Sequence, residues 1–262
     1  MISKKEVANQ YNSLAEDYEE RYQSEIRARI RNDIIFFTLK EIIAGRECTI
    51  LDAAGGTGFY SNPLVAKGQE VIILDLSKRM LLKARDKLRA EKIETVLGDA
   101  ENIGFSNEAF DVVLCHLALC HFPEPIKALK EFQRVLRKGG ILSLIVENKA
   151  FFSIIEAFRG NIDEALKRLN SKELFVNIGE LPRIRTFEKR ELINMCSGAG
   201  LKTIKTMGLG VLTDYLQACR KETLEENKEL ERLEKKLAET EEWTAIGRFL
   251  FLVCQKSGEN PR

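Results

Sequence analysis

The stretch Ile50-Leu51-Asp52-Ala53-Ala54-Gly55-Gly56-Thr57-Gly58 decides the fold. The apolar run over residues 48–53 predicts a buried strand, the glycines predict a tight turn, and residues 59–66 can resume as a helix. Glycines at such a turn let a ligand approach the backbone, and the first N–H groups of the helix point toward the same place. We therefore expect a crevice for a mononucleotide-like ligand at the carboxyl end of this strand.

Strand and helix patterns alternate on the C-terminal side of this turn. Further strands are predicted at 70–75, 95–97, 110–115, 140–147, 201–207 and 247–255. Helices are predicted at 78–91, 126–136 and 188–199. Strands that alternate with helices of this length form a mostly parallel sheet covered on both faces. We therefore predict a single α/β domain over residues 1–262.

Three segments outside this alternation are predicted to be helical. Residues 1–45 have apolar side chains at helical spacing, which predicts an N-terminal helical lid. Residues 148–186 lack a strand pattern, and we expect an inserted helical cap there. Residues 220–242 carry six basic and nine acidic side chains with one leucine stripe. This pattern favours a solvated helix lying on the domain over a coiled coil.

Composition excludes several classes of protein. The 262 residues are 44% hydrophobic and 31% charged, as in a globular chain. Lys and Arg number 41 and Asp and Glu 40, so binding to nucleic acid or to a membrane would need a local patch. No apolar run is long enough for a signal peptide or a membrane span, and the six scattered cysteines are typical of reduced thiols. We expect a cytoplasmic protein.

Asp75 indicates a nucleoside ligand. A carboxylate at the end of the second predicted strand can accept hydrogen bonds from both ribose hydroxyls. The dinucleotide fingerprint is incomplete, because residues 56–61 have serine where the third glycine would stand. A nicotinamide-dependent oxidoreductase is therefore a disfavoured alternative.

The motifs at 51–58, 75–81, 98–100 and 134–140 together resemble those of class I S-adenosylmethionine (SAM) dependent methyltransferases. Two departures are visible, because Ala54 replaces the usual first glycine and Lys138 replaces the usual proline. The resemblance implies a doubly wound, Rossmann-like sheet of seven strands, mostly parallel, with an antiparallel last strand. It also implies SAM as cofactor, S-adenosylhomocysteine (SAH) as product, and methyl transfer by in-line displacement.

The resemblance also assigns cofactor contacts by position. Gly55, Gly56 and Gly58 line the methionine end of SAM, and the same motif supplies Asp52 and Ala54. Asp75 holds the ribose, and the adenine lies against Asp99, Ala100 and Glu101. Leu76 and Met80 pack on the adenine and ribose, although Met80 could equally be a core residue of its helix.

A closer resemblance, spread over nearly the whole chain, is to the tRNA carboxymethoxyuridine methyltransferases. It rests on the segments 11–18, 143–148, 160–163, 214–216 and 246–249. By position, Arg31 matches an arginine that reaches the cofactor carboxylate, and His116 matches a histidine of the cofactor pocket. A guanidinium suits a carboxylate, but Arg31 could also be a surface residue. The expected partner is a small molecule or tRNA, and interleaved acidic residues dilute the basic patch of the cap.

The acceptor side is predicted from residues beyond the fourth strand and from the flanking segments. His121 is the candidate catalytic residue, as a general base or to orient the acceptor, or it could be structural. Residues expected to roof this side are Tyr11, Tyr18, Asn148, Phe151, Phe152 and Tyr215. No metal is expected, because the Cys-His pairs at 115–116 and 120–121 lack the spacing of a zinc site.

We therefore expect a SAM-dependent methyltransferase that acts on an oxygen of a small molecule or a modified nucleoside, with the tRNA wobble uridine as the specific version. A non-catalytic module that binds SAM or SAH remains open, because the motifs describe binding and not turnover.

Overall fold

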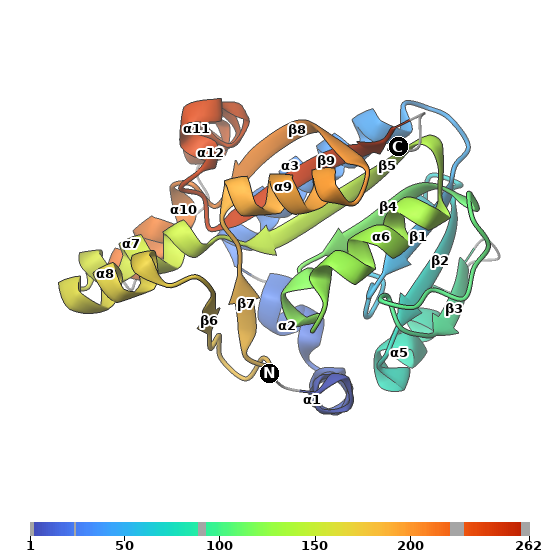
Figure 1. Ribbon diagram of the computed structural model, residues 1–262, viewed down its shortest axis with the longest axis horizontal. Helices are drawn as coiled ribbons and strands as arrows, with labels where there is room; N and C mark the ends of the chain where they lie inside the picture. The colour runs from blue at the N-terminus through green and yellow to red at the C-terminus, as the bar shows by residue number, and fades with distance from the viewer. Residues whose placement is uncertain (1–2, 24, 89–92, 221–227, 258–262) are drawn as a thin grey trace.

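The computed structural model describes residues 3–23, 25–88, 93–220 and 228–257. Its centre is a seven-stranded sheet with the order β3-β2-β1-β4-β5-β9-β8 (Figure 1). The strands are β1 (Thr49–Ala53), β2 (Glu70–Asp75), β3 (Ile93–Leu97), β4 (Phe110–His116), β5 (Leu136–Glu147), β8 (Leu201–Leu209) and β9 (Phe249–Lys256). The strand β9 pairs antiparallel with both β5 and β8. The predicted fold class is confirmed, including the direction of the last strand.

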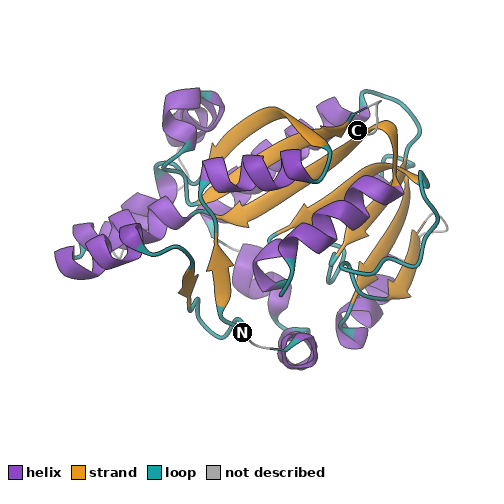
Figure 2. Cartoon of the chain, viewed as in Figure 1, coloured by secondary structure: helices purple, strands orange, loops and turns teal. Residues whose placement is uncertain are grey.

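Helices cover both faces of the sheet (Figure 2). On one face lie α6 (Pro125–Val135) and α9 (Lys189–Gly198), and on the other α3 (Ile26–Ile43), α5 (Lys78–Leu88) and α11 (Lys228–Glu239). Alternating side chains of β1 enter the two cores, so Ile50 packs on the α3 side and Leu51 on the α6 side, and both are fully buried. This two-sided burial explains why the strands read as nearly continuous apolar runs.

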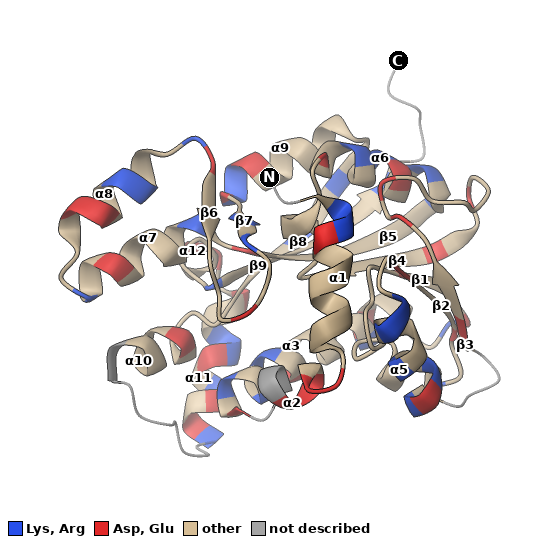
Figure 3. Cartoon of the chain, turned by 90° about the horizontal axis from the view of Figure 1, so that it is seen from below, with Lys and Arg blue, Asp and Glu red and all other residues tan. Residues whose placement is uncertain are grey.

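The N-terminal helices α1 (Lys4–Leu14) and α2 (Tyr18–Gln23) lie at the edge of the sheet that Figure 3 views. Ser3 and Glu6 form a capping box that fixes the start of α1. Ion pairs fasten this segment to α5, one between Glu16, in the connection of α1 and α2, and Lys83, and another between Glu19 of α2 and Lys87 at 2.6 Å. The N-terminal segment is thus held across the sheet edge rather than extended away from it.

Residues 148–186 contain more than helices. They form α7 (Lys149–Phe158), α8 (Ile162–Asn170) and a hairpin of β6 (Leu174–Val176) and β7 (Ile184–Thr186). The expectation of an all-helical segment missed this hairpin, because strands of three residues are too short to show a period of two. The backbone N–H of Phe187 donates to the carbonyl of Glu147 at 2.9 Å, so the hairpin is joined to the end of β5.

The segment before β9 forms α10 (Thr213–Arg220), α11 and α12 (Glu241–Thr244). Part of the predicted charged helix, residues 221–227, lies outside the described residues. Glu234 of α11 is buried, and its carboxylate accepts hydrogen bonds from the backbone N–H groups of Val211, Leu212 and Thr213. The helix therefore has an anchoring carboxylate, which a charge pattern alone does not reveal.

The helix predicted at 59–66 shortens to α4 (Asn62–Val65), and a 3₁₀ turn, η1 (Leu119–His121), follows β4. Within the described ranges, no helix combines the length and the apolar character that crossing a bilayer requires.

Candidate active site

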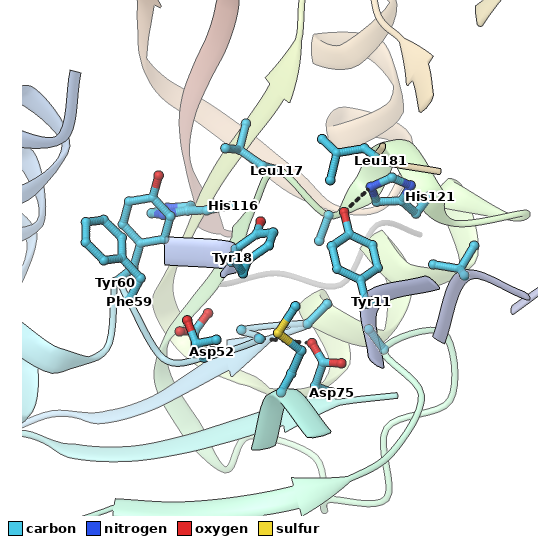
Figure 4. A pocket seen from close by; sticks show the side chains of 18 of the residues that line it. Tyr11, Tyr18, Asp52, Phe59, Tyr60, Asp75, His116, Leu117, His121 and Leu181 are labelled. Carbon is cyan, nitrogen blue, oxygen red and sulfur yellow. Dashed lines mark hydrogen bonds between the residues drawn. The ribbon is translucent and has the colours of Figure 1, made fainter. Parts of the chain in front are cut away.

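A cavity of about 250 Å³ lies where β1, β2 and β4 end, beneath α1 (Figure 4). Most of the sequence-predicted site residues line it: Tyr11, Tyr18, Arg31, Asp52, Ala54, Gly55, Gly56, Asp75, Leu76, Met80, Asp99, Ala100, His116 and His121. They come from the N-terminal helices and from the ends of four strands. The order of the strands, with β1 and β4 adjacent at the centre, is what brings them together.

The glycine turn after β1 is shaped by close contacts. A Cβ atom on Gly55 would lie 2.5 Å from Cγ of Asp52, and one on Gly58 would lie 2.6 Å from Cδ1 of Ile73. Gly58 therefore packs against the core and does not line the cavity, unlike Gly55 and Gly56. Ala54 has a φ of 57°, in the left-handed region that favours glycine. This backbone conformation explains why glycine is the usual residue at this position of the motif.

Two carboxyl groups face the turn, that of Asp52, which is buried, and that of Asp75, which is half-buried. Burial raises the pKa of Asp52 to about 6, against the effect of the hydrogen bond that Ser61 donates to it at 2.6 Å. Burial likewise raises the pKa of Asp75 to about 6, although its carboxylate accepts backbone hydrogen bonds from Ser77 at 2.7 Å and Gly56 at 2.9 Å. Asp75 is thus held by its neighbours in one orientation at the end of β2.

The far end of the cavity carries Asp99 and Ala100, while Glu101 is buried behind them. Lys4 of α1 reaches across to this end and pairs with Asp99 at 2.6 Å and also with Glu101. The backbone N–H of Glu124 donates to the Glu101 carboxylate at 2.6 Å. Glu101 therefore acts as a bridge between α1 and the start of α6, and it lies outside the cavity lining.

Arg31 and His116 lie near the opposite end. The Arg31 guanidinium carbon is 4.9 Å from the ring centre of Phe249, and its buried Nε has no hydrogen-bond partner in the described part of the chain. His116 Nε2 shares a hydrogen bond with Ser143 Oγ at 2.8 Å, and its ring stands edge to face with Tyr60. Burial lowers the pKa of His116 to about 3, so its imidazole is neutral near pH 7.

Tyr11 and His121 form a hydrogen-bonded pair over the cavity (Figure 4). The Tyr11 hydroxyl lies 2.7 Å from His121 Nε2, and the two rings meet edge to face with 5.3 Å between centres. The Tyr18 ring also lies edge to face with Tyr11. Burial lowers the pKa of His121 to about 4, which keeps the imidazole neutral and able to accept a hydrogen bond.

Four residues expected at the acceptor side lie elsewhere. Asn148 begins α7 and donates hydrogen bonds to the carbonyls of Ala245 and Gly247. Phe151, Phe152 and Tyr215 form an aromatic cluster between α7 and α10, and the Tyr215 hydroxyl donates to the carbonyl of Ile246 at 2.8 Å. An asparagine just before an apolar helical run is typical of a helix N-cap, and that signal was present in the sequence.

Comparisons with known proteins agree on one family. A family model described as a methyltransferase domain matches residues 51–144. The chain is 23% identical over 254 residues to the tRNA 5-carboxymethoxyuridine methyltransferase of Escherichia coli (strain K12), covering 94% of this chain and 95% of that one. It is 31% identical over 165 residues to the ubiquinone/menaquinone biosynthesis C-methyltransferase UbiE of Haemophilus ducreyi, covering 57% and 60%. The chain is a SAM-dependent methyltransferase with the class I fold.

Solved structures share the fold of this methyltransferase. The Burkholderia thailandensis 1,6-didemethyltoxoflavin-N1-methyltransferase, solved with 1,6-didemethyltoxoflavin and SAH, matches with a TM-score of 0.60 at 15% identity over 98% of this chain and 92% of that one. The [4+2]-cyclase SpnF matches with a TM-score of 0.63 at 17% identity over 98% of each chain. Because a cyclase shares the architecture, the fold alone does not fix the acceptor.

The methyltransferase uses SAM as its cofactor. In the described ranges no three His, Cys, Asp or Glu side chains converge in a way that would hold a metal ion.

Sequence reasoning missed five charged residues of the cavity wall, Lys4, Glu25, Arg27, Glu147 and Arg248. Glu147 ends β5 as Asp75 ends β2, so the same signal, an acidic residue at the carboxyl end of a strand, could have found it. Lys4 and Arg248 gave no such signal, because their neighbours come from distant parts of the chain.

Proposed function

We propose that SAM lies in this cavity with its ribose on Asp75 and its adenine beside Asp99, Ala100, Leu76 and Met80. Asp75 Oδ1 accepts a hydrogen bond from the backbone of Ser77 and Oδ2 accepts one from Gly56, and the two oxygens have further lone pairs that can accept from ribose hydroxyls. The observation that carries the proposal is this oriented, half-buried carboxylate at the end of β2, beside a glycine turn whose backbone a ligand can approach.

The methionine end of SAM would lie along Gly55 and Gly56, with its ammonium near Asp52 and its carboxylate on Arg31. The unpaired, buried Nε of Arg31 supports this placement, because a buried donor without a partner is costly unless a ligand satisfies it. His116, neutral and bonded to Ser143, would pack against the cofactor without adding charge.

The bound cofactor supplies a methyl group activated by its sulfonium. The proposed acceptor of that methyl group is an oxygen of a small molecule or a modified nucleoside, which would lie on the side of the cavity formed by Tyr11, Tyr18 and His121. These residues would exclude water and hold the acceptor in line with the methyl group, which is the main requirement of such a displacement. His121 would orient the acceptor through the Tyr11 hydroxyl that it holds.

A tRNA wobble uridine is the specific version of this proposal, and the relative that matches over 94% of the chain supports it. The charges of the cap weigh against a strong RNA surface. Arg185 pairs with Glu173 and Glu191, and Arg168 pairs with Glu156 and Glu164. Figure 3 shows acidic and basic residues interspersed on α8. A small molecule or a free nucleoside therefore fits this surface better than a tRNA.

The test is to incubate the protein with methyl-labelled SAM and total extract of the cell that makes it, and to follow label into RNA, protein and small-molecule fractions. Label in small molecules supports the small-molecule proposal, and label removed by ribonuclease supports the tRNA version. Asp75→Asn is the matched variant, and transfer at the wild-type rate in that variant would contradict the cofactor placement.

A further inference from the structure

Glu147 is a buried carboxylate that the proposed cofactor contacts leave unused. It ends β5, lines the cavity, and is 5% exposed. Its Oε2 atom is inaccessible to solvent and has no hydrogen-bond partner in the described part of the chain. The Cys120 thiol and the backbone of Glu147 itself hydrogen-bond the carboxylate, so the acceptor left without a partner is the single atom Oε2. Asp52, which is also buried in this wall, accepts a hydrogen bond from Ser61 at 2.6 Å.

Arg248 stands beside the same part of the wall with one unpaired donor. Its Nη1 bonds Asp214 at 2.7 Å, and Arg27 bonds the same Asp214 oxygen at 2.9 Å. The Arg248 guanidinium carbon lies 5.0 Å from the ring centre of Phe249. The side chain is thus fixed on two sides, while its buried Nε has no partner within the described ranges.

An unpaired acceptor and an unpaired donor in one cavity wall point to a ligand. Burying either group without a partner costs stability, and proteins keep few of them. SAM does not need either one, because Asp52 and Arg31 are available to its ammonium and carboxylate. His121 is also unsuitable to take a proton, since its Nε2 is engaged by Tyr11 and burial lowers its pKa to about 4.

We propose that Glu147 and Arg248 form the acceptor subsite, and that the acceptor is a hydroxyl compound. Glu147 Oε2 binds the O–H that is to be methylated, and Arg248 Nε binds a neighbouring carbonyl or carboxylate oxygen. This inference rests on the proposed function and narrows its oxygen acceptor to a hydroxyl group.

The proton balance of the step assigns a role to Glu147. The acceptor oxygen forms a bond to the methyl carbon, the bond from that carbon to sulfur breaks, and its electron pair stays on sulfur. The hydroxyl proton passes to Glu147 Oε2. Burial raises the pKa of Glu147, against the influence of Arg248, and a raised pKa makes a carboxylate a better proton acceptor.

A carboxylate acceptor would not fit this subsite. It has no proton to give, and its negative charge would face the Glu147 carboxylate in a buried site. The subsite is therefore expected to select hydroxyl acceptors over carboxylate acceptors. The fold alone does not distinguish these two classes of acceptor.

The proposed subsite is tested by two measurements, the alkali stability of the methylated product and the transfer rates of variants. Wild-type protein is incubated with methyl-labelled SAM and cell extract, and the labelled product is treated with mild alkali. Methyl esters release labelled methanol under these conditions, and methyl ethers do not. The same transfer is measured for Glu147→Gln, Glu147→Asp and Arg248→Lys, with Glu94→Gln, an exposed residue of β3, as the control. Binding of SAH is measured for every variant.

We expect an alkali-stable product and a transfer rate about 10²-fold lower in Glu147→Gln, the usual worth of a positioned proton acceptor. Glu147→Asp keeps the carboxylate and is expected to recover part of the rate, and Arg248→Lys keeps a cation beside Asp214 but loses Nε. SAH affinity is expected to change by less than about twofold, because the subsite contacts the acceptor.

Two results would overturn the inference while leaving the methyltransferase intact. One is labelled methanol on alkali treatment, which would make the acceptor a carboxylate whatever the variants do. The other is an alkali-stable product made by Glu147→Gln at the wild-type rate. If the wild-type protein binds SAH but labels nothing, the proposed function fails and this inference fails with it.

Discussion

Asp75 shows how one half-buried residue can link cofactor binding to pH. Its carboxyl group has a pKa near 6 in the folded protein, above the ordinary value of 3.8, because burial disfavours the charged form. A ribose needs the ionised form, which accepts hydrogen bonds from both hydroxyls. The protonated form keeps an O–H that competes for the same space.

We therefore expect SAH affinity to fall as the pH drops through about 6, because protonation of Asp75 must be reversed before the ribose binds. Asp75→Asn is expected to weaken binding by about 10-fold or more, since hydrogen bonds to a charged group are worth roughly 1.5–3 kcal/mol. Calorimetric titration at several pH values measures both effects. Asp163→Asn on exposed α8 is the control, and pH-independent affinity in the wild type would contradict the assignment.

The Tyr11–His121 pair makes a second prediction at this scale. We expect Tyr11→Phe and His121→Gln to lower the transfer rate about tenfold each, and the double variant to be no slower than either, because both remove one hydrogen bond. The His121 pKa of about 4 also predicts no imidazole titration in the rate between about pH 6 and 8. Additive losses in the double variant would show that the two side chains act separately.

At the scale of the elements, α11 contains a charged residue, Glu234, that stabilises the fold. Glu234 accepts hydrogen bonds from the start of α10 at 2.6, 3.0 and 2.8 Å, which join the two helices. The charged segment around it predicts a solvated face, and this residue is the exception that tertiary contacts create.

Glu234→Gln is expected to lower the free energy of unfolding by about 1–3 kcal/mol, because an amide offers one acceptor atom in place of a charged pair. Denaturant unfolding measures the loss, and Glu239→Gln, exposed on the same helix, is expected to change it by less than about 0.5 kcal/mol. Equal stability of the two variants would mean that the buried hydrogen bonds are dispensable.

Predictability from sequence also differs by element. The strands β1, β2, β4 and β5 are long apolar runs flanked by turn residues, so their positions follow from the sequence. The hairpin of β6 and β7 does not, because its three-residue strands are specified by contact with the end of β5. The same limit applies to Phe151 and Tyr215, whose residue types suit a core and a binding site equally well.

For the whole molecule, the sheet order explains why residues of the N-terminus, the glycine turn and β4 meet in one cavity. The motifs that follow the predicted strands indicated that the proposed cofactor-binding residues would lie together. They did not predict the contribution of Glu147 and Arg248. These two residues lie in the same cavity wall because β9 runs antiparallel beside β5, so that the start of β9 lies next to the end of β5. Charge is also a property at this scale, since 41 basic and 40 acidic residues nearly cancel.

Because Arg168 and Arg185 of the cap are paired with acidic side chains, we expect weak binding to unmodified tRNA at physiological salt, with a Kd in the range of about 10⁻⁶–10⁻⁴ M. Fluorescence anisotropy with a labelled tRNA, repeated at rising salt, gives the affinity and the number of phosphate contacts. A Kd well below 10⁻⁶ M with a steep salt slope would favour the tRNA version of the function, because each neutralised phosphate releases counterions and steepens the salt dependence.

The helix α1 has a consequence for the pace of catalysis. Ion pairs of Lys4, Glu16 and Glu19 anchor the segment that contains α1 and α2, and α1 forms one wall of the cavity that we propose for the cofactor. Each turnover must exchange SAH for SAM, and we expect this exchange to require α1 to move away from the cavity. Since salt weakens exposed ion pairs, we expect the dissociation rate of SAH to rise with ionic strength in stopped-flow experiments. Where release of SAH limits turnover, the ionic strength of the solution would then control the turnover rate.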